Sequence, residues 1–368
     1  MTLFLGLDIL DGDGLRPDHA LRLSGGRVAE LRPRQGGDQG TDLSDGSTRA
    51  LVCPGFLDLQ VNGGGGLMLG ECTTPKDLSR LAAAHRDGGT VGLLPTLISD
   101  TEAEIARIID LVAVASRQDP AILGLHLEGP HLGIAGAHDP ARLRPMTEAD
   151  VALYTQAAAR LPHLLITLAP ERASPAQIAA LAAAGVIVSL GHSAAGYDPA
   201  RAAYAAGARH ATHLFNAMSG LHHREPGMVG AALDGAPWIG LIADGVHVHD
   251  AGLRLAWRAA RDRLILVSDA MAVAGTDNDG FTLAGRTITR AGGRLTLADG
   301  TLAGADITMI GAVRHMAEAT GAALAEILPL GFDAPHRLLT GAPNRIAAGQ
   351  PARLLCLQGE RLRLLEQA

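Results

Sequence analysis

Residues 164–193 read LLITLAPERASPAQIAALAAAGVIVSLGHS, and this stretch decides the fold. It begins with an apolar run, Leu164–Ala169, and closes with a second one, Val186–Leu190, followed by a histidine. The Ala-rich segment between them has helix-start residues at Ser174-Pro175 and a helix-stop residue at Gly185. The stretch therefore predicts a strand, a helix and a second strand parallel to the first.

The same alternation recurs along the middle of the chain. Eight apolar runs fit buried strands: Gly55–Gln60, Thr90–Leu97, Ala121–Glu128, Leu164–Ala169, Val186–Leu190, His210–Leu214, Trp238–Ala243 and Leu264–Asp269. The segments Asp100–Ala115 and Asp198–Gly207 are predicted as two of the helices outside them. Eight strand–helix units predict an α/β fold, a (β/α)8 barrel of the TIM type.

Both ends of the chain have a different character. The first fifty residues alternate short apolar stretches with Gly, Asp and Pro turn signals, and Arg353–Leu357 and Arg361–Leu365 repeat this style. We predict that residues 1–53 and 346–368 form one small discontinuous β-sandwich domain, and that residues 54–345 form the barrel. The length of 368 residues suits a barrel of about 250 residues with a satellite of about 80 to 100.

Composition excludes several classes of partner. The formal net charge is −7, whereas nucleic-acid binding needs clustered Lys and Arg, so we expect no nucleic-acid partner. No apolar run reaches the roughly 18 residues of a membrane span, and Met1–Asp11 lacks the basic start of a signal peptide. We therefore expect no membrane partner and a cytoplasmic location. Cys53, Cys72 and Cys356 have no C-x-x-C spacing and are predicted to be buried and unpaired.

Polar residues at the ends of the apolar runs are the candidates for chemistry, because the active site of such a barrel lies where the strands end. Glu128 ends the third run, His192 follows the fifth, and His213 lies at the end of the sixth. Any one of them alone is more often a core histidine or a solvated glutamate. Three mixed N and O ligands that leave a position open are what a catalytic zinc site requires. We predict that they bind one divalent ion, expected to be zinc.

The other strand ends suggest the remaining parts of a one-metal site. Asp269 ends the eighth run and is predicted to be the general base, with a fourth metal ligand and a helix N-cap as alternatives. Lys76 is the only lysine and ends no strand, which argues against a Schiff base or a lysine-bridged metal pair. Gln60 and Asn62 at the first strand carry amides, which are poor metal ligands but good hydrogen-bonding groups. A mononuclear site follows.

Arg224 is the candidate for binding a phosphate. A guanidinium binds phosphate bidentately, and Arg224 lies in the loop that follows the strand of His213. A surface ion pair with Glu225 fits the sequence nearly as well. The glycine run Gly63–Gly66 lacks the pattern of a nucleotide phosphate loop.

Seven motifs, in this order along most of the chain, resemble the N-acetylglucosamine-6-phosphate deacetylase family of the amidohydrolase superfamily. The motifs are PGFLDLQVNG (54–63), HLEGP (126–130), GHS (191–193), ATHLFNAM (211–218), REPG (224–227), ADGVH (243–247) and VSDA (267–270). The ordered set, rather than any one motif, makes the resemblance specific.

The resemblance implies roles for individual residues. It supports Glu128, His192 and His213 as metal ligands and Asp269 as the acid/base, and Gln60 and Asn62 match the one-metal branch. His138 is similar to the residue that contacts the substrate and polarises its acetamide carbonyl. The residues that the resemblance assigns to substrate binding are Ala137, His138, Asn216, Ala217, Arg224, His247, Leu302, Ala303 and Gly304. Family members are commonly homodimers, and some phosphate contacts can come from the neighbouring subunit.

Two departures from the family pattern lie near the expected pocket. Ile134 and Ala135 stand where lysines are frequent, and His131 replaces an apolar or aromatic residue. We expect His131 to be an exposed loop residue, with contact to the metal or sugar as the alternative. The departures concern substrate preference.

The sequence thus predicts hydrolysis of the N-acetyl group of N-acetyl-D-glucosamine 6-phosphate, giving D-glucosamine 6-phosphate and acetate. Two alternatives stay open. The substrate could be N-acetylgalactosamine 6-phosphate or another N-acyl amino compound, which kinetics on both epimers would decide. The chain could also be a non-catalytic binding subunit, although the intact set of Glu128, His192, His213 and Asp269 argues against that.

Overall fold

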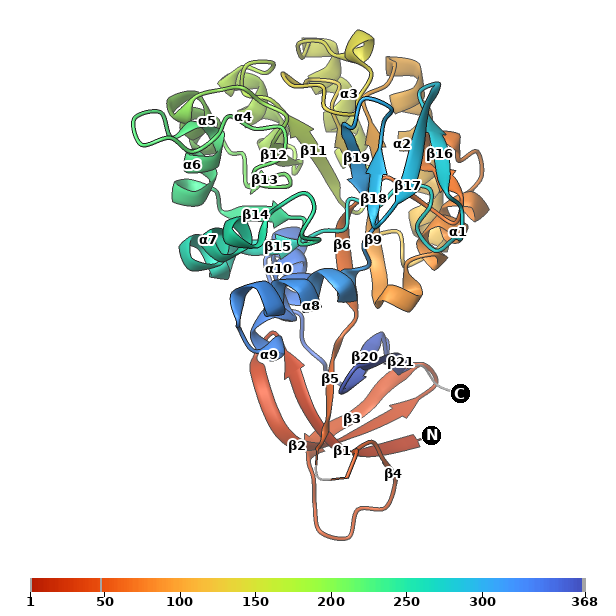
Figure 1. The fold of residues 1–368 in the computed structure, drawn as a ribbon. Coiled ribbons are helices and arrows are strands. Elements are labelled where there is room, and N and C mark those ends of the chain that lie inside the picture. The colour runs from red at the N-terminus through yellow and green to blue at the C-terminus, as the bar shows by residue number, and fades with distance from the viewer. Residues whose placement is uncertain (1, 47, 366–368) are drawn as a thin grey trace.

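The computed structural model describes residues 2–46 and 48–365, and its central element is a barrel of eight parallel strands (Figure 1). The strands follow one another in chain order around the sheet. They are β6 (Phe56–Val61), β9 (Thr90–Ile98), β10 (Leu125–Glu128), β11 (Leu164–Leu168), β12 (Ile187–Leu190), β13 (His210–Ala211), β14 (Trp238–Leu241) and β15 (Leu264–Leu266). Each lies within or overlaps one of the eight predicted runs. The predicted (β/α)8 fold is confirmed.

The first and last strands meet through single hydrogen bonds rather than a continuous ladder. The amide of Asp269 donates to the carbonyl of Gln60 at 3.0 Å, and the amide of Asn62 donates to Ala270 at 2.8 Å. Below them, the Asp58 carboxylate accepts the amide of Ser268 at 3.2 Å. These bonds close the barrel at the ends of the strands, and they bring Asn62 next to Asp269.

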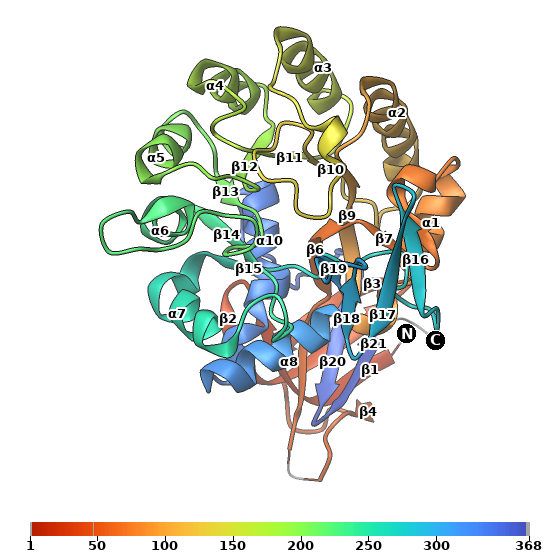
Figure 2. The ribbon, with the colours of Figure 1, turned by 45° about the horizontal axis from the view of Figure 1, so that its top comes forward.

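Helices surround the barrel, as Figure 2 shows from its open end. They are α1 (Pro75–Ala83), α2 (Glu102–Gln118), α3 (Glu148–Ala158), α4 (Pro175–Ala183), α5 (Tyr197–Ala205), α6 (Gly227–Gly235), α7 (Asp250–Ala260), α8 (Met309–Thr320), α9 (Leu324–Ile327) and α10 (Pro329–Thr340). Helix α4 begins after Ser174, whose side chain accepts the amide of Gln177, as the sequence predicted. Helix α5 begins at Tyr197, one residue before the predicted start, with Gly196 as its N-cap.

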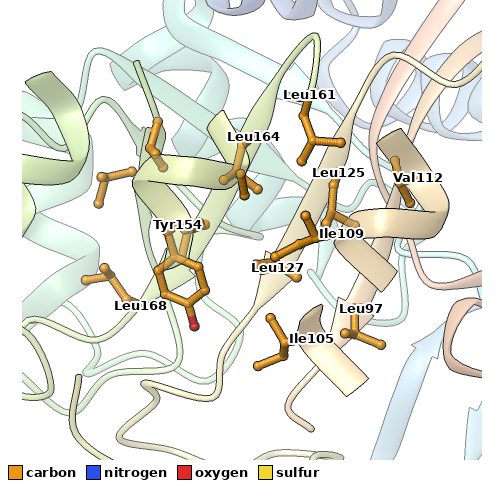
Figure 3. Packing of buried hydrophobic residues seen from close by; sticks show 14 of the residues in the cluster. Leu97, Ile105, Ile109, Val112, Leu125, Leu127, Tyr154, Leu161, Leu164 and Leu168 are labelled. Carbon is orange, nitrogen blue, oxygen red and sulfur yellow. The ribbon is translucent and has the colours of Figure 1, made fainter. Parts of the chain in front are cut away.

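The packing of α2 holds β10 in place. Ile105, Ile109 and Val112 form one buried stripe along α2. Figure 3 shows this stripe beside Leu125 and Leu127 of β10. Each fully buried side chain of this size contributes about 1.5 to 3 kcal/mol to folding. The strand that carries Glu128 at its end is therefore firmly fixed.

Both chain ends form one small domain, which lies below the barrel in Figure 1. Its strands are β1 (Thr2–Asp11), β2 (Gly14–Ser24), β3 (Arg27–Pro33), β4 (Thr41–Asp42), β5 (Ala50–Pro54), β20 (Leu354–Gln358) and β21 (Arg361–Leu365). The C-terminal β20 pairs antiparallel with β5, so the predicted discontinuous domain is confirmed. Hydrogen bonds connect all seven strands of the predicted sandwich in a single sheet. The domain boundaries at 53/54 and 345/346 stay a prediction, and residues 1, 47 and 366–368 lie outside the described residues.

A four-stranded antiparallel sheet between β15 and α8 was not predicted. Its strands are β16 (Gly280–Leu283), β17 (Arg286–Ala291), β18 (Arg294–Thr296) and β19 (Leu302–Ala305). A two-stranded ribbon after β6, β7 (Gly63–Gly64) with β8 (Leu67–Met68), packs against it through Met68. Leu283, Ile288 and Leu295 pack with Met271 and neighbouring apolar residues. This sheet carries the segment 302–304 to the active-site end of the barrel.

Within the described residues, no helix combines the length and apolar character needed to cross a bilayer. The three cysteines are buried and unpaired, as predicted.

Candidate active site

A cavity of about 240 Å³ opens where the barrel strands end. Twelve of the fifteen predicted site residues line it: Asn62, Glu128, Ala137, His138, His192, His213, Asn216, Ala217, His247, Asp269, Leu302 and Gly304. The other lining residues had no predicted role, and they are Ile98, Gly136, Ile242, Met271, Leu283 and Thr301. The predicted residues, scattered over the chain, therefore meet in one place.

Glu128 is the centre of the polar cluster. Its Oε1 lies 3.1 Å from Nε2 of His213 and 3.4 Å from Nε2 of His192, and the two Nε2 atoms are 3.0 Å apart. Gln60, buried behind the cavity, donates from Nε2 to the same carboxylate oxygen at 2.9 Å. One oxygen and two ring nitrogens thus converge within bonding reach of a single point.

The electrostatics of this cluster suit a cation. Burial would raise the pKa of Glu128, but hydrogen bonds from the surrounding histidines outweigh it and hold the pKa well below its usual value. Burial would lower the pKa of His213, yet its bond to Glu128 leaves the pKa raised. These shifts favour an ionised Glu128 carboxylate with a proton held on His213, at the point where a divalent ion would replace that proton.

Two sets of three ligands are geometrically possible, because the ligand atoms of Glu128, His138 and His192 also lie within 4.8 Å of one another. Hydrogen bonds at the opposite ring nitrogens distinguish the two histidines. Nδ1 of His192 donates to the carbonyl of Ile134 at 2.8 Å, which leaves a lone pair on Nε2 of the neutral ring. Nδ1 of His138 instead accepts the amide of Ser99 at 3.2 Å, which puts the ring proton on Nε2. Burial lowers the pKa of His138 and so keeps its ring neutral. His192 can therefore bind an ion, whereas His138 can donate a hydrogen bond.

Asp269 lies at the wall of the same cavity. Its Oδ1 accepts Nδ2 of Asn62 at 2.7 Å, and its backbone carbonyl accepts the amide of Ala305 at 3.0 Å. Burial, and to a lesser extent the charge of Glu128, raise the pKa of Asp269 to about 6. A carboxyl group held in this way can accept and return a proton near neutral pH.

The backbone is strained around the cluster. Seven described residues other than glycine have a positive φ, and five of them belong to this region: His192 at 49°, His213 at 29°, Phe215 at 78°, Ala217 at 49° and Asp269 at 51°. Such conformations cost of order 1 to 3 kcal/mol each and concentrate at functional sites. All of these residues except Phe215 line the cavity, so the sharp turns after the strands coincide with the site.

His247, which the resemblance assigns to substrate binding, is held in place by Asp244. Nδ1 of His247 bonds to the Asp244 carboxylate at 2.7 Å, and the other oxygen of Asp244 accepts the amides of Val246 and His247. Asp244 belongs to the ADGVH motif but had no predicted role. Arg224 is exposed and does not line this cavity, and none of the residues that do line it is a lysine or an arginine.

The expectation that His131 is exposed is wrong. Its ring is fully buried, and its Nε2 and Nδ1 bond to the hydroxyl of Tyr154 at 3.0 Å and to the carbonyl of Arg144 at 3.2 Å. Burial lowers the pKa of His131 to about 4. It does not line the cavity, so it orders the loop after β10.

A buried chain of hydrogen-bonded side chains crosses the barrel interior. Four of its members lie on β10, β11, β12 and β13, and the fifth, Thr212, directly follows β13. Neighbouring members are 2.5 to 2.8 Å apart, and in order they are His126, Thr167, Thr212, Ser189 and His210. Because this chain joins the strands that carry Glu128, His192 and His213, it holds their spacing. No sequence motif indicated it.

A profile of the amidohydrolase family matches residues 51–330. The chain belongs to the amidohydrolase family. Among its relatives, N-acetylgalactosamine-6-phosphate deacetylase of Shewanella sp. (strain ANA-3) is 40% identical over 341 residues, which are 91% of this chain and 86% of that protein. N-acetylglucosamine-6-phosphate deacetylase of Homo sapiens is 35% identical over 351 residues, 89% of this chain and 84% of that protein.

A solved amidohydrolase structure agrees with the fold. It is a mutant of N-acetyl-D-glucosamine-6-phosphate deacetylase from Mycobacterium smegmatis in complex with N-acetyl-D-glucosamine-6-phosphate. The TM-score is 0.88 at 31% sequence identity, and the match covers 97% of this chain and 95% of that chain. The membership and the cluster of Glu128 with histidines together identify a divalent-metal site of the amidohydrolase type.

Proposed function

We propose that this protein hydrolyses the N-acetyl group of N-acetyl-D-glucosamine 6-phosphate in the cytoplasm, releasing D-glucosamine 6-phosphate and acetate. The observation that carries the proposal is the convergence of Glu128, His192 and His213 with Asp269 in one cavity. The names of the relatives support the substrate class.

Glu128, His192 and His213 would hold one divalent ion, which we propose to be zinc. A zinc ion in such a site supplies a Lewis acid that polarises a carbonyl and activates a water. The donor set supports this choice, since two imidazole nitrogens and one carboxylate with an open position are typical of catalytic zinc.

The chain's own residues would handle the protons. Asp269 accepts a proton from the attacking water, while Asn62 keeps its carboxylate oriented through the 2.7 Å hydrogen bond. His138 donates from Nε2 to the acetamide oxygen, where negative charge develops as the water oxygen bonds to the carbonyl carbon. When the carbon–nitrogen bond breaks, Asp269 returns the proton to the leaving amine. Acetate and the free amino sugar result.

The phosphate would bind at His247 together with Arg224 of a second copy of the chain. The cavity needs a cation for a phosphate, yet the residues that line it include no lysine or arginine, and Arg224 is exposed on a separate loop. A guanidinium delivered across a dimer interface would complete the site. We therefore also propose a homodimer, with mixed sites between the subunits.

N-acetylgalactosamine 6-phosphate is the second candidate substrate. The observation in its favour is that the Shewanella relative, which carries that name, is more similar to this chain than the human enzyme. The two sugars differ only in the configuration of one hydroxyl group, which the metal cluster does not contact in the proposed mechanism.

Acetate release by the zinc-loaded protein tests the proposal. The substrates are N-acetylglucosamine 6-phosphate, its galactosamine epimer and unphosphorylated N-acetylglucosamine, with Asp269→Asn as the control. We expect the first to be turned over best, the third poorly because its phosphate is missing, and the variant to be nearly inactive. Faster acetate release from the galactosamine epimer would make that epimer the substrate. Equal rates with and without the phosphate would remove Arg224 and His247 from phosphate binding. Binding of the sugar phosphate without turnover would indicate a non-catalytic subunit.

A further inference from the structure

We propose that Ser99 is a positioning residue that fixes His138 as a hydrogen-bond donor toward the substrate. Ser99 directly follows β9 and is 6% exposed. It lies outside every motif discussed above. The inference rests on the proposed function for its effect on turnover, but its structural basis can be measured separately.

Both donors of Ser99 converge on one ring nitrogen. The backbone amide donates to Nδ1 of His138 at 3.2 Å, and the hydroxyl oxygen lies 2.9 Å from the same nitrogen. An amide can only donate, so Nδ1 must be the acceptor and the hydroxyl must donate as well. The alternative acceptor for that hydroxyl, the backbone carbonyl of Glu128, is 3.5 Å away. The ring proton of neutral His138 is therefore on Nε2.

This arrangement gives neighbouring histidines opposite roles. The rings of His138 and His192 lie 4.7 Å apart, yet the Nδ1 of one faces a donor and the Nδ1 of the other faces the carbonyl of Ile134. His192 thereby presents a lone pair and His138 presents a proton. Without the donors of Ser99, His138 could also present a lone pair, and it would then compete as a ligand instead of polarising the carbonyl.

The neighbouring backbone leaves space for this hydroxyl. Gly129 has φ of +88°, and a Cβ at that position would lie 2.2 Å from Oγ of Ser99. Only glycine combines that backbone conformation with room for the serine side chain. The glycine after Glu128 in the HLEGP motif is thus required by the contact that orients His138.

Kinetics of Ser99→Ala test the role. Loss of one hydrogen bond to a neutral ring should lower kcat about fivefold and change KM by less than about twofold, because the bond from His138 strengthens in the transition state. Ser99→Thr should restore kcat to within about twofold by keeping the hydroxyl. Ser79→Ala is the matched control, since it removes a 2.7 Å side-chain hydrogen bond to Asp119, far from the cavity, and should leave kcat unchanged.

A double-mutant cycle separates positioning from a general structural effect. In a His138→Ala background the Ser99 hydroxyl has no ring to orient, so Ser99→Ala should then have no further effect on kcat. An equal loss of kcat in both backgrounds, or an unchanged kcat in the single variant, would overturn the proposal.

Nitrogen-15 spectra of histidine-labelled wild-type protein test the tautomer without any substrate. Nδ1 of His138, assigned by its absence in His138→Ala, should resonate as an unprotonated ring nitrogen and Nε2 as a protonated one. The reverse pattern would overturn the proposal. The spectrum reports the tautomer of His138 even if Ser99→Ala fails to fold. If the tautomer is as proposed but the protein turns over none of the proposed substrates, only the proposed function fails.

Discussion

Replacing Gly304 by alanine is expected to lower both the stability of the protein and its turnover. Gly304 lies in β19 with φ of +68°, a conformation that costs an alanine about 1 kcal/mol. A Cβ there would lie 2.4 Å from Cγ of Met271 and 2.8 Å from the carbonyl oxygen of Asp269. Met271 is 3% exposed and cannot move into solvent. Relieving such overpacking costs about 1 to 3 kcal/mol more.

The sum is about 2 to 4 kcal/mol, which corresponds to a fall in Tm of roughly 3 to 5 °C for a chain of this size. Turnover should fall by about tenfold or more, because the backbone of Asp269 must shift to admit the new methyl group. Thermal unfolding gives the first quantity, and acetate release by the metal-loaded enzyme gives the second.

Gly300→Ala is the matched control. Gly300 lies in the turn before β19 with φ of +85°, and no atom comes within 4 Å of a Cβ built there. It should lose about 1 kcal/mol of stability from the backbone conformation alone and keep its kcat. Equal losses in the two variants would refute the reasoning, since the contact with Asp269 would then have no consequence.

Two further substitutions probe the site and the loop beside it. Asn62→Leu removes the donor to Asp269 and should lower kcat by about tenfold with the metal content unchanged; loss of the metal instead would place Asn62 in the metal site. Burial would raise the pKa of Asp150, but the bonds from Arg144 and Thr147 outweigh it and lower the pKa to about 2. This stabilisation is present above the usual carboxyl pKa near 4 and is lost as the pH falls toward 2. Asp150→Asn should therefore cost about 1 kcal/mol at pH 6 and less at pH 3 in urea unfolding, and a deficit independent of pH would contradict the assignment.

The barrel could be predicted from the sequence because its signal is repeated. Each strand is short, apolar and bounded by turn residues, and the helix between Ser174 and Gly185 begins and ends as its capping residues indicate. The run ending at Leu214 is longer than β13, since the backbone turns to φ of 29° at His213 and leaves the strand. Apolar character marks burial, and it does not report where the backbone turns.

The sheet β16–β19 was missed although signals were present. Gly292-Gly293 and Asp299-Gly300 are turn dipeptides at strand-like spacing, but the strands between them are largely polar on one face and follow no helix. The sheet explains how Leu283, which belongs to none of the sequence motifs, comes to line the cavity.

The metal cluster could be predicted residue by residue, whereas its supporting contacts could not. Glu128 is the last residue of β10 and His192 comes two residues after β12, so chain order alone places them at the same end of the barrel. Ser99 touches His138 across 39 residues, and the burial of His131 depends on Tyr154 in α3. Such pairings are set by tertiary packing, which no local pattern reports.

The metal content of two histidine variants tests the central claim most directly. The protein is purified without chelator, loaded with zinc, and analysed by elemental mass spectrometry beside His213→Ala and His138→Ala, two buried histidines that both lie next to Glu128. We expect one ion per chain in the wild type and in His138→Ala, and a large loss in His213→Ala. An ion retained without His213 but lost without His138 would contradict the proposed ligand set and the division of roles derived from it.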